Sequence, residues 1–251
     1  MRKDLLIMGS SRANHHYNSK ILEDSLRLTC YNCGQDGNGI VFNYGQWLLI
    51  SNRYKPSYII YDVMPCYDCL SGDNHQFLGW LKLYYERDGI KEVFQQVDST
   101  EVVKMLSKMY RYNYNPLQYV ADFIKPIYQV DSTGFVPIKG ELNPMQIKKR
   151  ESDKQVYQFD IMKLHFIERL IERLGKTKII FVVSPSWYGM SKESFKPIEE
   201  LCNKKGCRFI DFSNNPKYVH QNYYFKDGMH LNERGADEFT KDLIGQLLED
   251  K

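Results

Sequence analysis

A carboxylate and a histidine stand three positions apart near the end of the chain, as Asp227 and His230. On a turn, a carboxylate at this spacing can hold Nδ1–H of the ring and leave Nε2 to take a proton from a hydroxyl. Hydroxyls are available near the other end of the chain, where Gly9, Ser10 and Ser11 follow a short apolar run. A serine in such a turn can be a nucleophile, or it can only cap the helix that follows. An isolated Asp-x-x-His occurs often by chance, so the chemistry depends on whether the fold brings these residues together.

The segments between the two motifs predict an α/β fold. Short apolar runs alternate with amphipathic stretches, which is typical of parallel strands joined by right-handed helical crossovers. We predict strands at residues 5–8, 27–33, 58–61, 178–183 and 208–212, and helices at residues 21–26, 40–53, 195–204 and 236–247. The fold class is therefore a three-layer α/β/α, flavodoxin-like arrangement around a five-stranded parallel sheet. In such a sheet ligands bind beyond the carboxyl ends of the strands, where both motifs should meet.

The alternation of strands and helices is interrupted between the third and fourth predicted strands, at about residues 73–174. This stretch is helical and polar-aromatic, so we expect a helical insertion that forms a lid or wall over one end of the sheet. The chain is then a single domain over residues 1–251. Much of the 14% aromatic content falls in or beside the insertion, which suggests that it shapes the substrate cleft. The aromatic residues concerned are Trp80, Tyr84, Tyr85, Tyr110, Tyr112, Tyr114 and Trp187.

The two motifs and their placement resemble those of the SGNH (GDSL-type) hydrolase superfamily. Gly9–Ser11 matches the Gly-Asp-Ser-like first block, with Ser10 where the family usually has Asp, and Asp227 and His230 match the last block. The resemblance covers about residues 1–70 and 175–250. It implies that Ser11 is the nucleophile, that His230 is the base, and that Asp227 orients the ring. The sequence Gly-Ser-Ser-Arg is also similar to the first block of the acyl-transfer and polysaccharide-modifying branches.

The resemblance further implies an oxyanion hole. Its donors would be the N–H of Ser11 and the N–H of a second-block glycine, for which Gly37 is the best match. The third block, usually Gly-x-Asn-Asp, should lie in residues 62–68, but Tyr67 stands where the family has Asn. Tyr67, Asn14 or Asn38 could supply the missing donor, or the site could be impaired. Loss of such a donor commonly lowers turnover by about 10²–10³.

These observations predict a serine ester hydrolase that works through an acyl-enzyme and needs no metal or organic cofactor. The resemblance suggests short acyl esters, acetyl included, on a small molecule or a glycan. An O-acyltransferase of the same fold remains open, as does a catalytically degenerate carbohydrate- or envelope-binding protein. Three residues are candidates for substrate binding. Arg12 would hold an anionic group or pair with a carboxylate such as Asp36, and Trp187 and Tyr188 would stack on a sugar or pack against the insertion.

Two cysteine pairs, Cys30/Cys33 and Cys66/Cys69, invite a zinc or redox interpretation. The gap of 33 positions between the pairs exceeds the roughly 15–20 of a zinc ribbon. Residues three apart on a strand also point to opposite faces, so Cys30 and Cys33 could not chelate together. We therefore expect buried thiols and no metal site.

The remaining candidates are two further pairs. Cys202 and Cys207 flank a helix-to-strand turn and could form a local disulfide if the protein is exported. His15 and His16 follow the nucleophile turn, and a surface or substrate-contact role is favoured over metal ligation.

Charge and hydropathy exclude other classes of function. The formal net charge is +3 with no long basic run, so we expect no nucleic-acid partner. No apolar run approaches the roughly 18 residues of a membrane-spanning helix. The chain enters its first strand directly after Met1–Asp4, which leaves no room for a signal peptide. The protein is then cytoplasmic, or extracytoplasmic if a leader has been removed. The sequence leaves the oligomeric state open.

Overall fold

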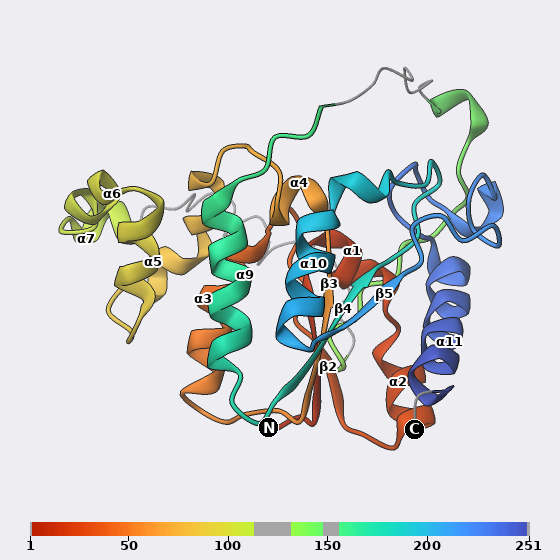
Figure 1. Cartoon of the computed structure of the whole chain (residues 1–251), viewed down its shortest axis with the longest axis horizontal. Coiled ribbons are helices and arrows are strands. Elements are labelled where there is room, and N and C mark those ends of the chain that lie inside the picture. The colour runs from red at the N-terminus through yellow and green to blue at the C-terminus, as the bar shows by residue number, and fades with distance from the viewer. Residues whose placement is uncertain (1, 113–131, 148–155, 250–251) are drawn as a thin grey trace.

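The computed structural model describes residues 2–112, 132–147 and 156–249, and it contains one parallel sheet flanked by helices (Figure 1). The strands run in the order β2-β1-β3-β4-β5, which is the flavodoxin-like order. Their bounds are β1 Leu5–Gly9, β2 Cys30–Asn32, β3 Tyr58–Asp62, β4 Lys178–Val183 and β5 Arg208–Asp211. Every neighbouring pair is parallel, so the predicted fold class is confirmed.

Strand β2 is shorter than predicted. We expected it to begin at residue 27, but Arg27 adopts a left-handed conformation (φ 57°) that ends the preceding helix, α2 (Ser19–Leu26). The next residues form the turn, and pairing with β1 begins at Cys30 opposite Leu5. A left-handed residue that ends a helix is most often glycine, so an arginine at this position does not mark the boundary.

The sheet is buried on both faces because β1, β3, β4 and β5 each alternate between two apolar clusters. Ile60 and Val182 pack in one cluster, whereas Ile59 and Tyr61 pack in the other. Continuous apolar runs are needed for strands covered on both sides, which explains why the runs were visible in the sequence. The core therefore lies in two layers, one on each side of the sheet.

Six longer elements cover these two faces (Figure 1). On one side lie α1 and α2, which contact the C-terminal helix α11. On the other side α9 contacts both α3 and α10. The bounds are α1 Ser11–His16, α3 Ile40–Ser51, α9 Ile161–Arg173, α10 Lys196–Lys205 and α11 Glu233–Glu249. Helix α9 falls inside the predicted insertion, but its apolar face packs in the core, so that boundary is corrected: α9 is the crossover helix between β3 and β4.

The first part of the insertion lies beside α3, on the far side of the molecule from α11 (Figure 1). Its elements are η1 His75–Leu78, η2 Trp80–Tyr84, α5 Ile90–Val97, α6 Ser99–Lys104 and α7 Lys108–Tyr112, and the short helix α4 Pro65–Asp68 precedes them. The short helices η3 Pro144–Gln146, η4 Lys192–Ser194 and η5 Asn222–Tyr224 complete the described elements. Whether the insertion acts as a lid or wall stays a prediction.

The aromatic residues of the first part of the insertion do not gather into one cleft. Tyr85 is buried against Phe94, whereas Trp80 and Tyr84 line a groove of about 900 Å³ together with residues of α3. Tyr114 lies outside the described residues. In the described part of the chain, residues 132–147 are the segment of the insertion that contacts α1 and α11 through backbone hydrogen bonds.

Within the described ranges, no helix is both long enough and apolar enough to cross a bilayer.

Candidate active site

The first motif forms a tight turn at the carboxyl end of β1. Gly9 has φ 139°, and a Cβ there would lie 2.8 Å from the carbonyl oxygen of Asp62, so only glycine fits. Ser10 is the N-cap of α1, and its Oγ accepts a hydrogen bond from the Arg12 N–H at 3.4 Å. Ser11 is the first residue of the helix. The capping role that a serine could have here therefore belongs to Ser10, and the Ser11 hydroxyl is left for another contact.

The second motif forms a turn before α11. The Asp227 carboxylate accepts hydrogen bonds from the N–H groups of Met229, at 2.8 Å, and His230, at 2.9 Å. Its other oxygen lies 2.9 Å from Nδ1 of the His230 ring. Oδ1 of Asn232 accepts from the Gly235 N–H at 3.0 Å, which caps α11. Backbone and ring contacts together fix the orientation of the imidazole.

The two turns meet at the carboxyl edge of the sheet, beside β1, where the strand order changes direction. Ser11 Oγ lies 2.8 Å from Nε2 of His230, although 219 positions separate them in the sequence. Because Nδ1 faces the Asp227 carboxylate, it carries the ring proton and Nε2 is the acceptor. The three residues thus form a continuous Ser–His–Asp hydrogen-bonded chain.

Solvent reaches this chain, since the Asp227 side chain is 53% exposed and that of His230 is 27% exposed. Burial acts to raise the pKa of Asp227, but the hydrogen bond and charge of His230 and the two backbone N–H groups lower the pKa to about 2. Asp227 is therefore ionised at neutral pH and can stabilise an imidazolium at His230.

The chain is similar in structure to proteins of the GDSL type. It aligns over its whole length with 98% of a GDSL-like lipase from Parabacteroides merdae, at 13% identity and a TM-score of 0.47. It also aligns over 98% of its length with an acetyl xylan esterase from the rumen bacterium Butyrivibrio proteoclasticus, at 9% identity and a TM-score of 0.41, and spans 63% of that protein. No protein-family model and no curated protein matches the chain. Both structural similarities are weak, and the chemistry of the site rests on the contacts within this chain.

Two backbone N–H groups, those of Ser11 and Gly37, are the predicted donors of the oxyanion hole. As the first residue of α1, Ser11 has an N–H without an acceptor inside the helix. Gly37 lies in a turn closed by a hydrogen bond from the Asn38 N–H to the Gln35 carbonyl, and its φ of 69° favours glycine. The Gln35 N–H donates to the Gly9 carbonyl at 3.1 Å, which places this turn beside the nucleophile turn. The pairing of Ser11 and Gly37 as an oxyanion hole stays a prediction.

The three candidates for the missing third-block donor have other contacts. The Tyr67 ring lies edge-on to Phe77, with ring centres 5.8 Å apart. Asn38 donates through its amide to the Asp36 carbonyl at 2.9 Å, and Asn14 donates to the Asp36 carboxylate at 2.8 Å. The side-chain amides of Asn14 and Asn38 each retain a second N–H. A role in the oxyanion hole stays a prediction for these two residues and for Tyr67.

The prediction that Arg12 binds the substrate is wrong, because Arg12 is not exposed. Its side chain is fully buried beneath the site, where Nε lies 3.6 Å from Asp62 Oδ1. The guanidinium also donates to Oγ and to the carbonyl of Ser184. The predicted alternative, an ion pair with a nearby carboxylate, is confirmed, but the carboxylate is Asp62 at the end of β3 and not Asp36, which was the example. Burial raises the pKa of Asp62, which the Arg12 charge opposes.

His15 and His16 are both buried, so the predicted surface or substrate-contact role is wrong. His16 lies between Oγ of Ser184, at 2.9 Å, and the N–H of Leu231, at 3.0 Å. His15 contacts Asp36 at 3.2 Å. The spacing of His15 from Ser11 was a usable signal, since residues four positions apart on a helix lie on the same face.

Trp187 and Tyr188 pack beside the loop that carries the base. The Trp187 N–H donates to the Gly228 carbonyl at 3.1 Å, and its indole N–H donates to Asn222 at 2.8 Å. A Cβ on Gly228 would lie 2.2 Å from the Tyr188 ring. The two aromatics are therefore adjacent to Asp227, and sugar stacking stays a prediction.

All six cysteines are free thiols in the structure. Burial raises the pKa of Cys30 and of Cys33 to about 12, which leaves these thiols protonated and unreactive at neutral pH. Cys202 and Cys207 are adjacent across the predicted turn, with a backbone hydrogen bond of 2.9 Å between them, but they are not bonded as a disulfide.

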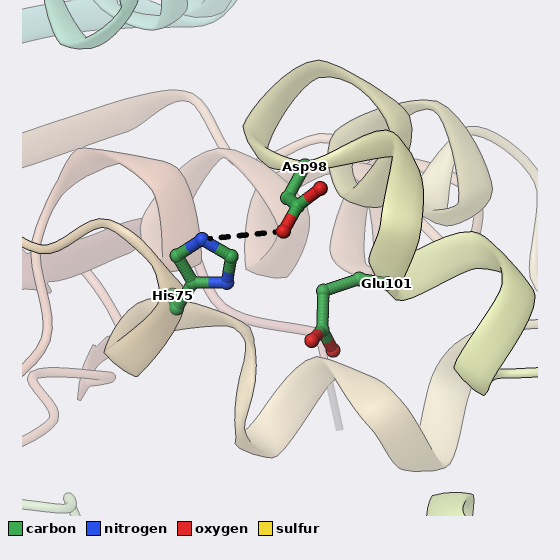
Figure 2. A group of neighbouring side chains, drawn as sticks. All are labelled: His75, Asp98 and Glu101. Atoms are coloured by element: carbon green, nitrogen blue, oxygen red, sulfur yellow. Dashed lines mark ion pairs between the residues drawn. The ribbon is translucent and has the colours of Figure 1, made fainter.

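Within the described residues one histidine-carboxylate group has the proximity that a metal site requires, namely His75, Asp98 and Glu101 (Figure 2). Its members already have partners. His75 pairs with Asp98 at 3.4 Å, while Glu101 accepts from Lys104 at 2.6 Å and from the Tyr110 hydroxyl at 2.8 Å. These ion pairs and hydrogen bonds account for the proximity of the three side chains.

Proposed function

We propose that the protein is a serine ester hydrolase of the SGNH type, with Ser11, His230 and Asp227 as its catalytic residues. The observation that carries the proposal is the hydrogen-bonded chain from Ser11 Oγ through His230 to Asp227, with distances of 2.8 and 2.9 Å. Nucleophile, base and orienting carboxylate are arranged as acyl transfer requires.

In the proposed reaction His230 Nε2 takes the proton of the Ser11 hydroxyl while Oγ bonds to the acyl carbon. The carbonyl oxygen becomes an oxyanion, which the N–H groups of Ser11 and Gly37 stabilise. The intermediate collapses when the C–O bond to the alcohol breaks and His230 returns its proton to the departing oxygen. Water then loses a proton to His230 and attacks the acyl carbon. The bond between that carbon and Ser11 Oγ breaks, His230 returns the proton to Oγ, and the acid is released.

We further propose short acyl esters, with acetyl esters of carbohydrates first, as the substrates. The similarity of Gly-Ser-Ser-Arg to the polysaccharide-modifying branches of the superfamily supports this choice, as does the position of Trp187 and Tyr188 beside the base loop. Aromatic rings suit the apolar faces of sugars.

The test uses a fluorophosphonate probe and p-nitrophenyl acetate on the wild-type protein and the Ser11→Ala variant. We expect the wild type to gain one covalent label by intact mass and to release p-nitrophenol, and Ser11→Ala to do neither. The neighbouring Ser10→Ala is the matched control and should keep both properties. Labelling of Ser11→Ala, or unchanged hydrolysis by it, would show that the mechanism is wrong.

Hydrolase and O-acyltransferase differ only in the second acceptor. Acetylated oligosaccharides offered with and without unmodified ones distinguish them, because a hydrolase releases acetate whereas a transferase produces a newly acetylated acceptor. Glycan binding without label or turnover would instead indicate a degenerate binding protein, which is the outcome that loss of the third-block Asn would produce.

A further inference from the structure

His15 lies one helical turn after Ser11 on α1, directly beside the proposed base. Its ring centre is 5.9 Å from that of His230, with the two rings almost perpendicular at 89°. The residue is only 4% exposed, so its polar atoms need protein partners. The proposed mechanism assigns no role to this buried histidine.

Both ring nitrogens of His15 face hydrogen-bond acceptors. Nδ1 lies 2.7 Å from the carbonyl oxygen of Val136, and Nε2 lies 3.2 Å from Oδ2 of Asp36. A carbonyl oxygen and an ionised carboxylate can only accept, and neutral imidazole has only one N–H. The protonated, positively charged ring is therefore the form that satisfies both contacts.

Asp36 connects this charge to the turn that contains Gly37. Its Oδ1 accepts a hydrogen bond from the Asn14 amide at 2.8 Å, so two consecutive residues of α1 hold the same carboxylate. Asp36 immediately precedes Gly37 in the turn closed by Asn38 and Gln35. The position of the Gly37 N–H relative to Ser11 thus depends on a contact with the nucleophile's own helix.

We propose that His15 and Asp36 form a charged pair that fixes the turn of residues 35–38 against α1 and so holds the Gly37 N–H where the oxyanion forms. The proposal rests on the proposed function. His15 and Asp36 are positioning residues, since they act through Gly37 and not on the substrate. With no third-block Asn, the proposed site depends more heavily on this backbone donor.

The charges around the pair favour its ionised form. Burial acts to lower the pKa of His15, but the hydrogen bonds to Asp36 and Val136 and the charges of Asp36 and Asp227 raise the pKa above its ordinary value. Among the described residues, His16 and His230 are titratable groups that interact with His15 or lie beside it, and Arg12 acts on His16. As the pH rises through the pKa of His15 the ring loses its charge, so turnover should fall on the alkaline side.

The experiment compares His15→Gln, Asp36→Asn and the double variant in hydrolysis of p-nitrophenyl acetate. We expect kcat to fall about 10–100-fold with KM nearly unchanged, because a displaced oxyanion donor weakens only the transition state. The double variant should lose no more than either single variant, since both break one pair. Asp36→Glu, which keeps the charge, should retain more activity than Asp36→Asn.

His75→Gln is the matched control, because it removes a histidine-aspartate pair that lies in the insertion (Figure 2). It should leave kcat unchanged. The alkaline fall in kcat of the wild type should disappear in His15→Gln, which a loss of folding alone would not produce. Unchanged kcat in His15→Gln and Asp36→Asn, with Ser11 still labelled, overturns the inference and leaves the proposed function standing.

A second measurement does not depend on turnover. NMR titration of the imidazole signals should show His15 titrating above an ordinary histidine, and Asp36→Asn should lower the pKa of His15. An ordinary pKa at His15 in the wild type overturns the charged pair, whatever the enzyme assay shows. Absence of Ser11 labelling, by contrast, contradicts the proposed function and not the pair.

Discussion

The Leu231 N–H donates a hydrogen bond of 3.0 Å to Nε2 of His16, which joins the residue after the proposed base to the helix of the nucleophile. Since Nε2 is the acceptor, the His16 proton is on Nδ1, which lies 2.9 Å from Oγ of Ser184 at the end of β4. One buried imidazole thus connects α1, the sheet and the base loop. Its neutral form is required, because a second ring proton would face the Leu231 N–H.

The pH dependence of stability should report this neutral histidine. Burial, and then the charges of Arg12, His230 and His15, hold the pKa of His16 well below its usual range. Below about pH 6.5 the unfolded chain binds a proton at this position and the native protein does not, so native stability falls as the pH falls. His16→Gln lacks this proton uptake. The stability advantage of the wild type should therefore shrink by about 1 kcal/mol between pH 6.5 and 5.5 in urea unfolding. Parallel curves for the two proteins would contradict the assignment.

Asp227→Asn should impair the chemical step. The asparagine oxygen can still accept from the Met229 and His230 N–H groups, but its amide would face Nδ1 and drive the ring proton to Nε2. His230 could then not accept the Ser11 proton, and kcat should fall by about 10²–10⁴ with little change in KM. Steady-state hydrolysis of p-nitrophenyl acetate measures this. Asp98→Asn, which affects the remote pair with His75, is the control and should behave as wild type.

Ser10→Ala should separate capping from catalysis. Loss of the Ser10 Oγ contact with the Arg12 N–H removes the N-cap of α1 and should cost about 0.5–2 kcal/mol of stability. Fluorophosphonate labelling of Ser11 should persist. A stable Ser10→Ala protein that no longer takes the label would mean that the two serines have exchanged roles.

Arg12→Met should destabilise the protein strongly, because it leaves the Asp62 carboxylate buried without its cation. Removing one partner of a buried ion pair typically costs about 3–5 kcal/mol. Adding Asp62→Asn should recover part of that loss, since the uncompensated charge is gone. Urea unfolding of the wild type, the two single variants and the double variant measures this coupling. Additive losses would show that the pair does not interact.

Much of the fold could be predicted from local pattern. The apolar runs of β1, β3 and β4 are continuous because both faces of the sheet are covered. Each strand meets that requirement through its own residues. The same holds for the second site motif, because Asp227 contacts Met229 and His230, which are close to it in the sequence. Ser11 and His230 could be paired in advance because parallel strands direct both motifs to one edge.

The sequence alone therefore determined the α/β sheet and the two turns, and it predicted that Ser11, His230 and Asp227 meet. Only the tertiary structure decided what surrounds them: Arg12 meets Asp62 and not Asp36, His15 and His16 are buried, and α9 belongs to the core. The physical reason is that a buried polar group must find a partner, and for these residues the partners come from other strands and loops. Strand and turn patterns depend on neighbouring residues, whereas the choice of a distant partner depends on how the completed layers pack.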